Sequence, residues 1–206
     1  NYNKKNKTNY DAIIINDGSK DKTEEICIQN NIPHITLVHN LGIGGAVQTG
    51  YKYAQENNYD IAIQFDGDGQ HDASYIKDMV KELEDNDIII GSRFVTEKKP
   101  FTPRMLGSRL LTFLIKLVTG KKINDPTSGM RMLDRSVMKE FANNMNYPPE
   151  PDTLVYMLKK GKKVKEVQVS MREREFGESY LNPIRSMIYM LEMVISIVFI
   201  QSFRKR

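Results

Sequence analysis

The sequence predicts an α/β protein with a mostly parallel sheet and helices on both of its faces. Short β-branched runs alternate with amphipathic segments through the first ninety residues, and two of these runs end in acidic, glycine-containing turns. Alternation at this spacing is typical of βαβ units. The composition agrees, because 40% hydrophobic and 27% charged residues suit a chain that buries a core.

The first half of the chain supplies the repeating strands and helices. In open α/β sheets, ligands bind beyond the carboxyl ends of the strands. We therefore expect the active centre at the two acidic turns, which begin at Asp17 and at Asp66. The expected strands cover residues 11–16, 35–38, 60–66 and 87–91, and the expected helices cover 21–31, 43–57 and 75–84.

The second half is more apolar and less regular. We expect a strongly apolar helix over 105–118, which carries only Arg109 and Lys116 as charged residues. The turn at 125–129 is followed by a short strand and a helix that ends near Phe141. The remaining expected elements are a Pro-rich acidic loop at 147–152, a strand at 164–171 and an apolar helix at 183–203.

Length, charge and cysteine content exclude several classes of protein. The 206 residues suit one domain with at most an appendage, and the net charge is only +4. One cysteine and three scattered histidines make a disulfide framework and a Cys/His zinc site unexpected. No signal peptide and no uncharged 20-residue span is visible, so neither export nor a full membrane crossing is indicated. We expect no nucleic-acid partner.

The acidic turn at Asp66-Gly67-Asp68 is a candidate metal site. Two carboxylates one residue apart, after an apolar strand, offer the oxygen ligands that Mg²⁺ or Mn²⁺ prefers. The alternative is an ordinary turn, because Asp and Gly are common turn residues. The run continues to Asp72 as DGDGQHD, and this extension favours the metal site.

Six ordered motifs carry a resemblance to a known family. They are NDGS at 16–19 with Asp21 and Thr23, NLG at 40–42 with GGA at 44–46, DGDGQHD at 66–72, GSRF at 91–94, DPTSGMR at 125–131, and Arg174 with Gly177 and Ser179. Over residues 10–200 the chain resembles family 2 glycosyltransferases of the GT-A fold. Among these it is most similar to dolichol-phosphate mannosyltransferases and bacterial polyprenyl-phosphate glycosyltransferases.

The resemblance implies a binding site for a nucleotide-sugar donor. Asp17 would contact the nucleoside, and the glycine-rich stretch from Gly42 to Gly45 would let the backbone approach the nucleotide closely. The metal on the donor diphosphate would be held by Asp66 and Asp68, with Gln70 as a third ligand. The full donor set that the resemblance implies is Asp17, Gly18, Ser19, Asn40, Gly42, Gly45, Asp66 and Arg93.

The resemblance also implies an acceptor-phosphate site built from arginines. Arg93 and Arg131 would line the pocket, although a single arginine is more often a surface residue. Arg174, with Ser179, resembles the segment that binds the lipid phosphate, and Arg172 is the neighbouring alternative. A guanidinium group suits a phosphate because it offers two parallel donors.

Glu150 and Asp152 occupy the place where many family members keep a catalytic base, and with Arg131 they form the expected catalytic set. A hydroxyl acceptor needs a base to remove its proton, whereas a phosphate acceptor is already ionised. The two acids could therefore act as a base or merely orient Arg131 or Arg174. Both readings stay open.

The helices at 105–118 and 183–203 carry more apolar surface than a small sheet protein needs. They could cover the sheet or form a homodimer seam. Arg185 and Glu192 argue against a bilayer crossing, and the basic residues 204–206 fit an interfacial amphipathic helix. We expect a peripheral protein at the inner, cytoplasmic face of the cell membrane, in contact with the membrane surface.

Residues 1–180 are expected to form the glycosyltransferase domain, with a nucleotide-sugar-binding half at 1–94 and an acceptor-binding half at 95–180. Residues 181–206 would be the apolar, basic C-terminal helix. Only about ten Asn- and Lys-rich residues precede Asp11, so we expect the first strand of the family's fold to be missing.

The expected function is sugar transfer, with inversion and with metal assistance, from a nucleotide-diphosphate sugar to polyprenyl phosphate or a lipid-linked glycan in cell-surface glycan synthesis. The alternatives are a sugar-1-phosphate nucleotidyltransferase, which would need a basic glycine-rich loop near its start, and an inactive scaffold that binds a membrane partner.

Overall fold

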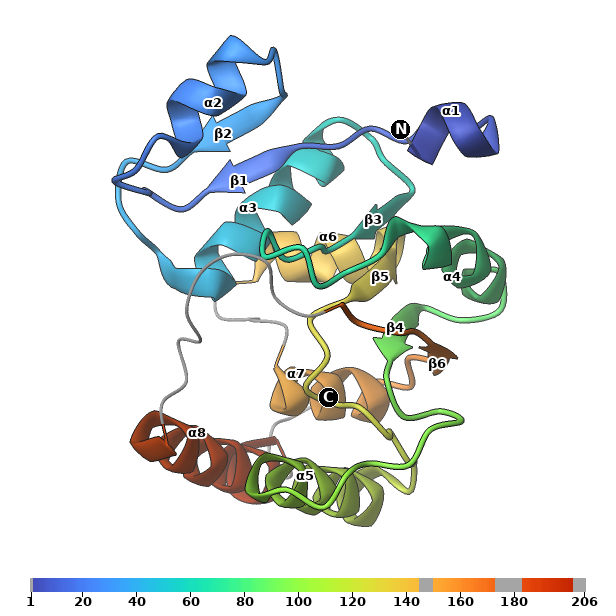
Figure 1. Cartoon of the computed structure of the whole chain (residues 1–206). Coiled ribbons are helices and arrows are strands. Elements are labelled where there is room, and N and C mark those ends of the chain that lie inside the picture. Colours follow the sequence, from blue (N-terminus) through green and yellow to red (C-terminus); the bar gives the residue numbers. More distant parts are fainter. Residues whose placement is uncertain (1, 145–149, 173–182, 202–206) are drawn as a thin grey trace. The chain divides into compact units, whose positions relative to one another are not determined.

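The computed structural model describes residues 2–144, 150–172 and 183–201 (Figure 1). It contains two compact units, and each is described by itself. The first comprises residues 1–62 and 135–148, and the second comprises residues 63–134 and 149–206. The unit boundaries therefore fall at other positions than the functional division expected at residue 94, which stays a prediction.

The first unit is built on two parallel strands. β1 (Ile14–Asn16) pairs with β2 (His34–Thr36), so that Ile15 lies opposite Ile35. Ahead of β1, described residues 2–13 contain a short helix and no strand. The helices of this unit are α1 (Tyr2–Asn6), α2 (Thr23–Gln29), α3 (Gly42–Glu56) and α6 (Arg135–Asn143).

Helices α3 and α6 hold the first unit together although they are far apart in the sequence. The rings of Tyr51 and Phe141 meet edge to face, with centroids 5.8 Å apart. The Gln48 amide donates to the carbonyl oxygens of Phe141 and Asn144, at 3.2 and 2.7 Å. Because Gln48 satisfies these carbonyls at the end of α6, the two helices are joined by polar contacts as well as apolar ones.

The second unit contains a sheet with the strand order β3-β5-β4-β6. Its first strand along the chain is β3 (Ile61–Ile63). β4 (Ile88–Ser92) runs parallel to β6 (Val164–Gln168) and antiparallel to β5 (Arg131–Asp134). β4 lies inside the sheet and is buried along its whole length. This position explains its uninterrupted apolar run, which is typical of a strand covered on both faces.

The helices of the second unit begin and end with recognisable signals. The hydroxyl of Thr102 accepts from Met105 N at 3.3 Å and caps α5 (Pro103–Thr119), and Gly120 ends this helix with φ 72°. The other helical elements are the 3₁₀ turn η1 (Ala73–Tyr75), α4 (Ile76–Leu83), α7 (Pro151–Lys159), α8 (Pro183–Ile195) and the π-helical turn η2 (Ser196–Ile200).

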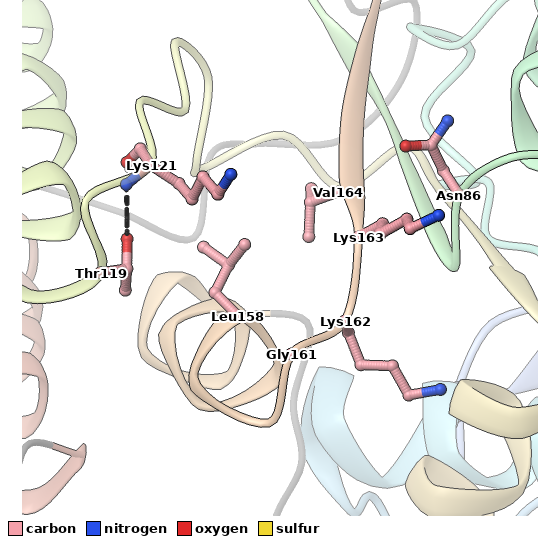
Figure 2. Close-up of a pocket in the computed structure, with 8 residues that line it drawn as sticks. All are labelled: Asn86, Thr119, Lys121, Leu158, Gly161, Lys162, Lys163 and Val164. Atoms are coloured by element: carbon pink, nitrogen blue, oxygen red, sulfur yellow. Dashed lines mark hydrogen bonds between the residues drawn. The ribbon is translucent and has the colours of Figure 1, made fainter.

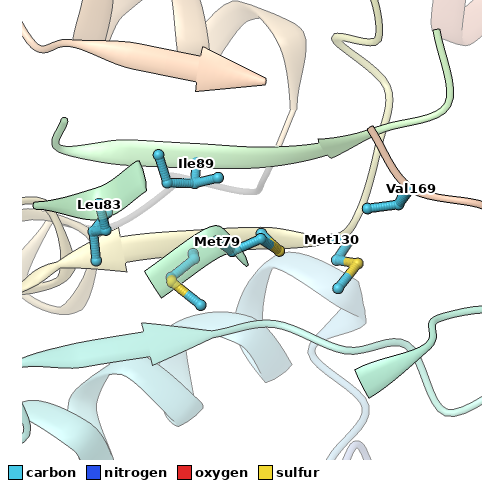
Figure 3. Packing of buried hydrophobic residues seen from close by; sticks show 6 residues of the cluster. Met79, Leu83, Ile89, Met130 and Val169 are labelled. Carbon is cyan, nitrogen blue, oxygen red and sulfur yellow. The ribbon is translucent and has the colours of Figure 1, made fainter. Parts of the chain in front are cut away.

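Helix α4 packs against β4, β5 and β6, and the main apolar cluster lies between them (Figure 3). Four of its members are methionine or isoleucine side chains that are completely or almost completely buried. Unbranched methionine fills irregular gaps, which suits a cluster assembled from several elements. The cluster consists of Met79, Leu83, Ile89, Met130, Met132 and Val169.

The α/β fold with a mainly parallel sheet is confirmed. Two details differ from the expectation. β5 runs antiparallel to β4, and residues 151 and 152 of the acidic loop expected at 147–152 belong to helix α7, which begins at Pro151. Residues 147–149 lie outside the described residues. Proline is favoured in the first turn of a helix, because its missing N–H has no partner there. Within the ranges that the structure describes, no helix is both long and apolar enough to cross a membrane.

Gly91 in β4 gives a test of the packing. A Cβ atom on Gly91 would lie 2.8 Å from the sulfur and 3.1 Å from the Cβ of Met130, which is itself buried. We expect Gly91→Ala to lower the free energy of unfolding by about 1–3 kcal/mol in urea denaturation, because the core is overpacked. Gly67→Ala is the matched control, since nothing lies within 4 Å of its Cβ position. Equal stability of the two variants would contradict the packing argument.

Candidate active site

The acidic loop after β3 belongs to the second unit and is ordered by its own side chains. The Asp66 backbone N–H donates to His71 Nδ1 at 3.0 Å, and the Gln70 backbone N–H donates to Asp68 Oδ1 at 3.1 Å. The Gln64 amide donates to Asp66 Oδ1 at 3.3 Å. The Asp66 carboxylate is 37% exposed, so it faces solvent from an ordered backbone.

The buried side chain of His71 supports the acidic loop. Its side chain is 3% exposed, its ring meets that of Phe65 edge to face, and its Nε2 atom lies 3.8 Å from Asp66 Oδ2. Burial lowers the pKa of His71, and the nearby carboxylates of Asp66 and Asp68 only partly oppose this effect. Since Nδ1 accepts a backbone hydrogen bond, the neutral ring carries its proton on Nε2.

Gly129 provides the clearance that Asp66 needs. A Cβ atom at residue 129 would lie 2.7 Å from Asp66 Oδ2, which is closer than real Cβ contacts come. The turn at 125–129 therefore lies directly against the acidic loop. This contact joins two of the motifs on which the family resemblance depends.

The donor set of the loop fits a hard divalent cation. Carboxylate oxygens from Asp66 and Asp68 suit Mg²⁺ or Mn²⁺, which usually complete their coordination with substrate phosphates and water. The described residues contain no group of three or more His, Cys, Asp or Glu side chains placed to hold a metal. Gln70, the expected third ligand, donates its amide to the Arg172 carbonyl at 3.4 Å.

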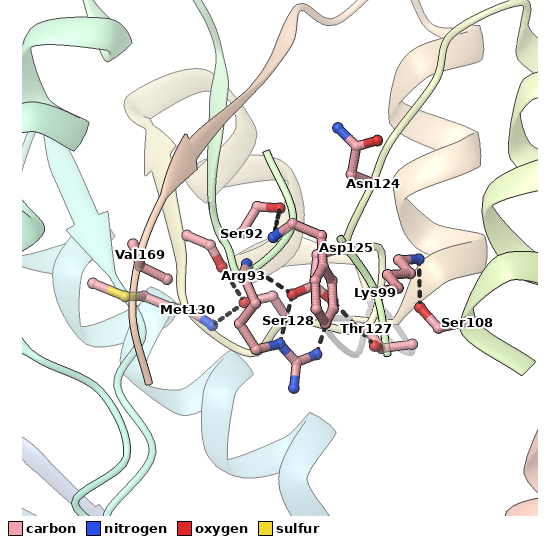
Figure 4. A network of polar contacts seen from close by, with 12 residues as sticks. Ser92, Arg93, Lys99, Ser108, Asn124, Asp125, Thr127, Ser128, Met130 and Val169 are labelled. Carbon is pink, nitrogen blue, oxygen red and sulfur yellow. Dashed lines mark hydrogen bonds and ion pairs between the residues drawn. The ribbon is translucent and has the colours of Figure 1, made fainter. Parts of the chain in front are cut away.

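A buried ion pair fixes the end of β4 (Figure 4). Asp125 is completely buried, and its two carboxylate oxygens accept from Nε and Nη2 of Arg93 at 2.7 and 2.8 Å. The Arg93 backbone N–H also donates to Asp125 Oδ2, at 3.1 Å. Glu166 in turn accepts from the Asp125 backbone N–H, at 2.7 Å. The contact of Arg93 with a phosphate stays a prediction, and any such contact must be made by an arginine already paired with Asp125.

Lys99 joins the segment after Arg93 to helix α5 (Figure 4). Its ammonium group donates to Ser108 Oγ at 2.8 Å and to Thr112 Oγ1 at 3.1 Å. Burial lowers the pKa of Lys99, while the carboxylates of Asp125 and Glu166 act in the opposite direction. The helix and the loop after β4 are therefore held as one structure.

Arg131, expected to contact a phosphate, is 3% exposed. Its guanidinium donates to the carbonyl oxygens of Pro126 at 2.8 Å, Ser128 at 3.1 Å and Glu150 at 3.4 Å. Arg131 therefore holds the turn at 125–129 and the start of α7 together. Its phosphate contact and its catalytic role stay predictions, and the burial supports a positioning role instead.

Glu150 and Asp152 lie at the start of α7 and bind side chains of the C-terminal helix. The Tyr189 hydroxyl donates to Glu150 Oε2, and the Ser196 hydroxyl donates to Asp152 Oδ2 at 2.6 Å. Burial raises the pKa of Glu150, although the hydrogen bond from Tyr189 and the charge of Arg131 act to lower it. The sequence pattern did not predict the contacts with Tyr189 and Ser196.

The acceptor segment is described only in part. Arg172 forms an ion pair with Asp72 at 2.6 Å and donates its backbone N–H to the Gln70 carbonyl at 3.0 Å, so it lies on the acidic loop. Arg174 and Ser179 lie outside the described residues, and their assignment stays a prediction.

The first unit brings most of the other donor residues together. Asp17 Oδ1 accepts from the Leu41 backbone N–H at 2.7 Å, and the Asn40 amide donates to the Asp17 carbonyl at 2.9 Å. Gly18 has φ 67°, and a Cβ there would lie 3.1 Å from Asn40 N. Ser19 N–H donates to Asn16 Oδ1 at 3.1 Å. The NDGS and NLG motifs therefore form one structure, and their contact with a donor stays a prediction.

Helix α3 begins with the two other predicted glycines. Gly42 has φ 73°, a conformation that side chains rarely adopt. At Gly45, a Cβ would lie 2.4 Å from the Cβ of Leu41. Both glycines are therefore required by the local structure, and their contact with a nucleotide stays a prediction.

A separate pocket of about 320 Å³ lies at the amino ends of β4 and β6 (Figure 2). It is therefore at the opposite end of these strands from Arg93. Lys162 pairs with Asp87 at 3.0 Å, and Lys121 and Lys163 also line the pocket. Helices α5 and α7 end nearby, and helix carboxyl ends favour positive charge. This explains the lysines without a ligand.

Comparisons with known proteins show the family. Residues 2–141 match the domain described as glycosyl transferase family 2. The undecaprenyl-phosphate mannosyltransferase of Micrococcus luteus is 26% identical over 184 residues, which is 84% of this chain and 76% of that protein. The UDP-N-acetylglucosamine–dolichyl-phosphate N-acetylglucosaminyltransferase of Methanococcus voltae is 32% identical over 161 residues, which is 66% of this chain and 64% of that protein.

The fold is also found among solved structures. Glucosyl-3-phosphoglycerate synthase from Mycobacterium tuberculosis, in complex with phosphoglyceric acid, superposes with a TM-score of 0.63 at 16% identity. The match covers 95% of this chain and 70% of that one. At this identity the likeness concerns the fold alone.

The buried Glu150 gives a prediction for stability. Because its pKa is raised in the folded state, the stability that its neutral form provides is complete below the ordinary glutamate pKa. This stability is lost as the pH rises through the folded-state value. We therefore expect Glu150→Gln to be more stable than the unchanged protein in urea at pH 7, and the difference to disappear near pH 4.

Glu25→Gln is the matched control for this comparison, because Glu25 is exposed on α2. It should give no such difference between the two pH values. Equal or lower stability of Glu150→Gln at pH 7 would show that its contacts outweigh the effect of burial.

Proposed function

The chain belongs to glycosyl transferase family 2 and has the GT-A fold, and we propose that it transfers a sugar from a nucleotide-diphosphate sugar to polyprenyl phosphate. The observation that carries this proposal is the ordered pair of carboxylates, Asp66 and Asp68, held against the turn at 125–129. The relatives named above supply the acceptor class, since their names specify undecaprenyl phosphate and dolichyl phosphate.

In this reaction an acceptor oxygen attacks the anomeric carbon of the sugar, and the bond from that carbon to the diphosphate breaks. Attack from the opposite face inverts the anomeric centre. The bonding electrons leave with the nucleoside diphosphate, so negative charge grows on that group. The loop around Asp17 and Asn40 would bind the nucleoside, and the acidic loop would face the diphosphate.

The proposed cofactor is Mg²⁺ or Mn²⁺, held by Asp66 and Asp68 with Gln70 as a third ligand. Such a cation neutralises the charge that develops on a departing diphosphate. Gln64 donates to Asp66 Oδ1 and His71 accepts from the Asp66 backbone N–H, while Gly129 leaves the space that Asp66 Oδ2 occupies. Gln70 would exchange its contact with the Arg172 carbonyl for the cation.

We also propose that helices α5 and α8 contact the membrane surface that holds the acceptor, at its inner, cytoplasmic face. Leu106, Leu110, Phe113 and Leu117 follow one another at helical spacing and are all exposed on α5. Exposed apolar side chains of α8 and η2 continue this surface, and α5 packs against both elements (Figure 1). These side chains are Met187, Ile188, Leu191, Ile195, Phe199 and Ile200.

Charge favours a lipid surface over a second copy of the chain as the partner of these helices. Arg109 and Lys116 lie on α5, and Lys121 and Lys122 follow it. Residues 204–206, which are all basic, lie outside the described residues. An apolar face with basic residues beside it suits anionic lipid headgroups. Two copies that met through this surface would bring like charges together.

The activity assay uses a panel of UDP- and GDP-sugars with a short polyprenyl phosphate, with and without Mn²⁺. Metal-dependent formation of a glycosylated lipid is the expected result. Nucleotide exchange onto a sugar phosphate would support a nucleotidyltransferase instead. Absence of any metal-dependent binding of nucleoside diphosphate would support the scaffold alternative.

Within this assay, we expect Asp68→Ala to lower metal-dependent transfer by at least about 100-fold, because a metal ligand is lost. The thermal midpoint should change little, since the hydrogen bond from the Gln70 backbone N–H to Asp68 Oδ1 lies within a surface loop and not in the core. Asp85→Ala, at an exposed acid after α4, is the control and should retain activity. A large loss of stability without metal would show that Asp68 is structural.

Paired substitutions on α5 test the membrane contact. Phe113 and Leu117 are 61% and 70% exposed, and replacing both by Gln should lower co-sedimentation with anionic vesicles by about tenfold or more. The control pair is Ile26→Gln with Ile28→Gln on α2, where exposure is 52% and 60%. Unchanged sedimentation with vesicles, accompanied by loss of a dimer in sedimentation velocity, would assign this face to self-association.

A further inference from the structure

Helix α8 and the turn η2 hold both acids at the start of α7. Tyr189 donates its hydroxyl to Glu150, and Ser196, two turns later, donates to Asp152 at 2.6 Å. Lys159 at the other end of α7 donates to the Gln201 carbonyl at 2.8 Å. The C-terminal helix is therefore attached to α7 by polar contacts along the whole length of that helix.

Tyr189 is held in place from its other side as well. The neighbouring residue, Met190, lies against Gly107 of α5, where a Cβ atom would come within 3.0 Å of the methionine sulfur. This glycine lets α8 approach α5 closely. The packing of Met190 thus supports the part of α8 that carries Tyr189, whose hydroxyl donates to Glu150.

The Glu150 carboxyl depends on this hydroxyl for its charged form. Burial alone disfavours a carboxylate, and the groups facing Glu150 are Arg131 on β5, Asp152 on α7 and Tyr189 on α8. The Tyr189 hydroxyl donates to the carboxylate, and Arg131 donates to the Glu150 carbonyl. A donor to a buried carboxylate stabilises the ionised form.

A continuous series of contacts leads from α8 to the acidic loop. Arg131, which donates to the Glu150 carbonyl, also donates to the Ser128 carbonyl at 3.1 Å. The next residue, Gly129, lies against the Asp66 carboxylate. All of these residues belong to the second unit. The start of α7 is therefore connected to the proposed metal ligand through the Arg131 side chain and the backbone of residues 128 and 129.

We propose that Tyr189 is a positioning residue for sugar transfer, which holds the Glu150 carboxylate ionised and oriented beside Arg131. The inference rests on the proposed function, and it assigns to α8 a part in the reaction in addition to its contact with the membrane. Ser196 orients Asp152 through its own hydrogen bond to Oδ2. The acid pair is complete only when the C-terminal helix is docked.

The test is Tyr189→Phe in the full chain, because it removes the hydroxyl and keeps the ring. We expect kcat to fall about tenfold, as for loss of a hydrogen bond to a charged group, with KM for the nucleotide sugar unchanged. The acid limb of the pH–rate profile should move to higher pH, since the ionised form of Glu150 loses a donor. An acid limb caused by the acceptor phosphate would not move.

Tyr75→Phe is the matched control. Its hydroxyl, in the same unit, accepts from the Ser170 backbone N–H at 3.0 Å and makes no hydrogen bond with an acid within the part of the chain that the structure describes. It should lose a comparable amount of stability and keep the pH profile. Equal shifts in both variants, or a fall in kcat that is the same at every pH, would reduce Tyr189 to a structural role and overturn the proposal.

A double variant separates the two residues. In a Glu150→Gln background, Tyr189→Phe should produce no further loss of kcat, because the group that it positions has gone. Additive losses would show that Tyr189 acts elsewhere.

A measurement without activity distinguishes this inference from the proposed function. The carboxyl ¹³C resonance of Glu150, assigned by its disappearance in Glu150→Gln, should titrate at higher pH in Tyr189→Phe than in the unchanged protein. If the Glu150 titration shifts in Tyr189→Phe but the protein shows no transfer activity, the proposed function is contradicted. The hydrogen bond between Tyr189 and Glu150 would still be supported. An unshifted titration would overturn the inference even if transfer is observed.

Discussion

The buried carboxylate of Asp125 is the constraint on which the site depends. It accepts two hydrogen bonds from the Arg93 guanidinium and a third from the Arg93 backbone, and Glu166 on β6 binds its own backbone N–H. A charge that is buried without such partners destabilises a fold by about 3–5 kcal/mol. The end of β4 and the turn at 125–129 therefore have one favourable arrangement. This arrangement also determines where the side chains of the turn lie.

The turn at 125–129 also contacts two other parts of the site, the acidic loop and the start of α7. Gly129 reaches the Asp66 carboxylate, so the position of the turn decides how the acidic loop can lie. The Arg131 guanidinium donates to carbonyl oxygens of the turn and of Glu150, so it also connects the turn to the start of α7. The proposed metal ligands and the acid pair thus share a single support.

The sequence was informative wherever the structure depends on local pattern. The strands that end at Asn16 and before Asp66, the helix starts and the paired carboxylates follow from periodicity and turn chemistry. Helix α7 was not visible, because Pro149 and Pro151 resemble a loop until Pro151 is placed in a first helical turn. The contacts of Arg93 with Asp125, of Arg131 with Glu150 and of Glu150 with Tyr189 could not be predicted, since the partners are 19–39 positions apart in the sequence. Contacts of this kind are decided by packing, which no local pattern records.

Gly42 and Gly129 show two different reasons for a glycine in one site. Gly42 has a positive φ, and nothing lies within 4 Å of its Cβ position, so a side chain there would be strained by the backbone conformation and not by its neighbours. Gly129 has no positive φ but no room, so even the smallest side chain would displace Asp66. Substitution scanning should therefore distinguish them: at residue 42 the cost comes from the backbone conformation, whereas at residue 129 it comes from the volume of a single carbon atom.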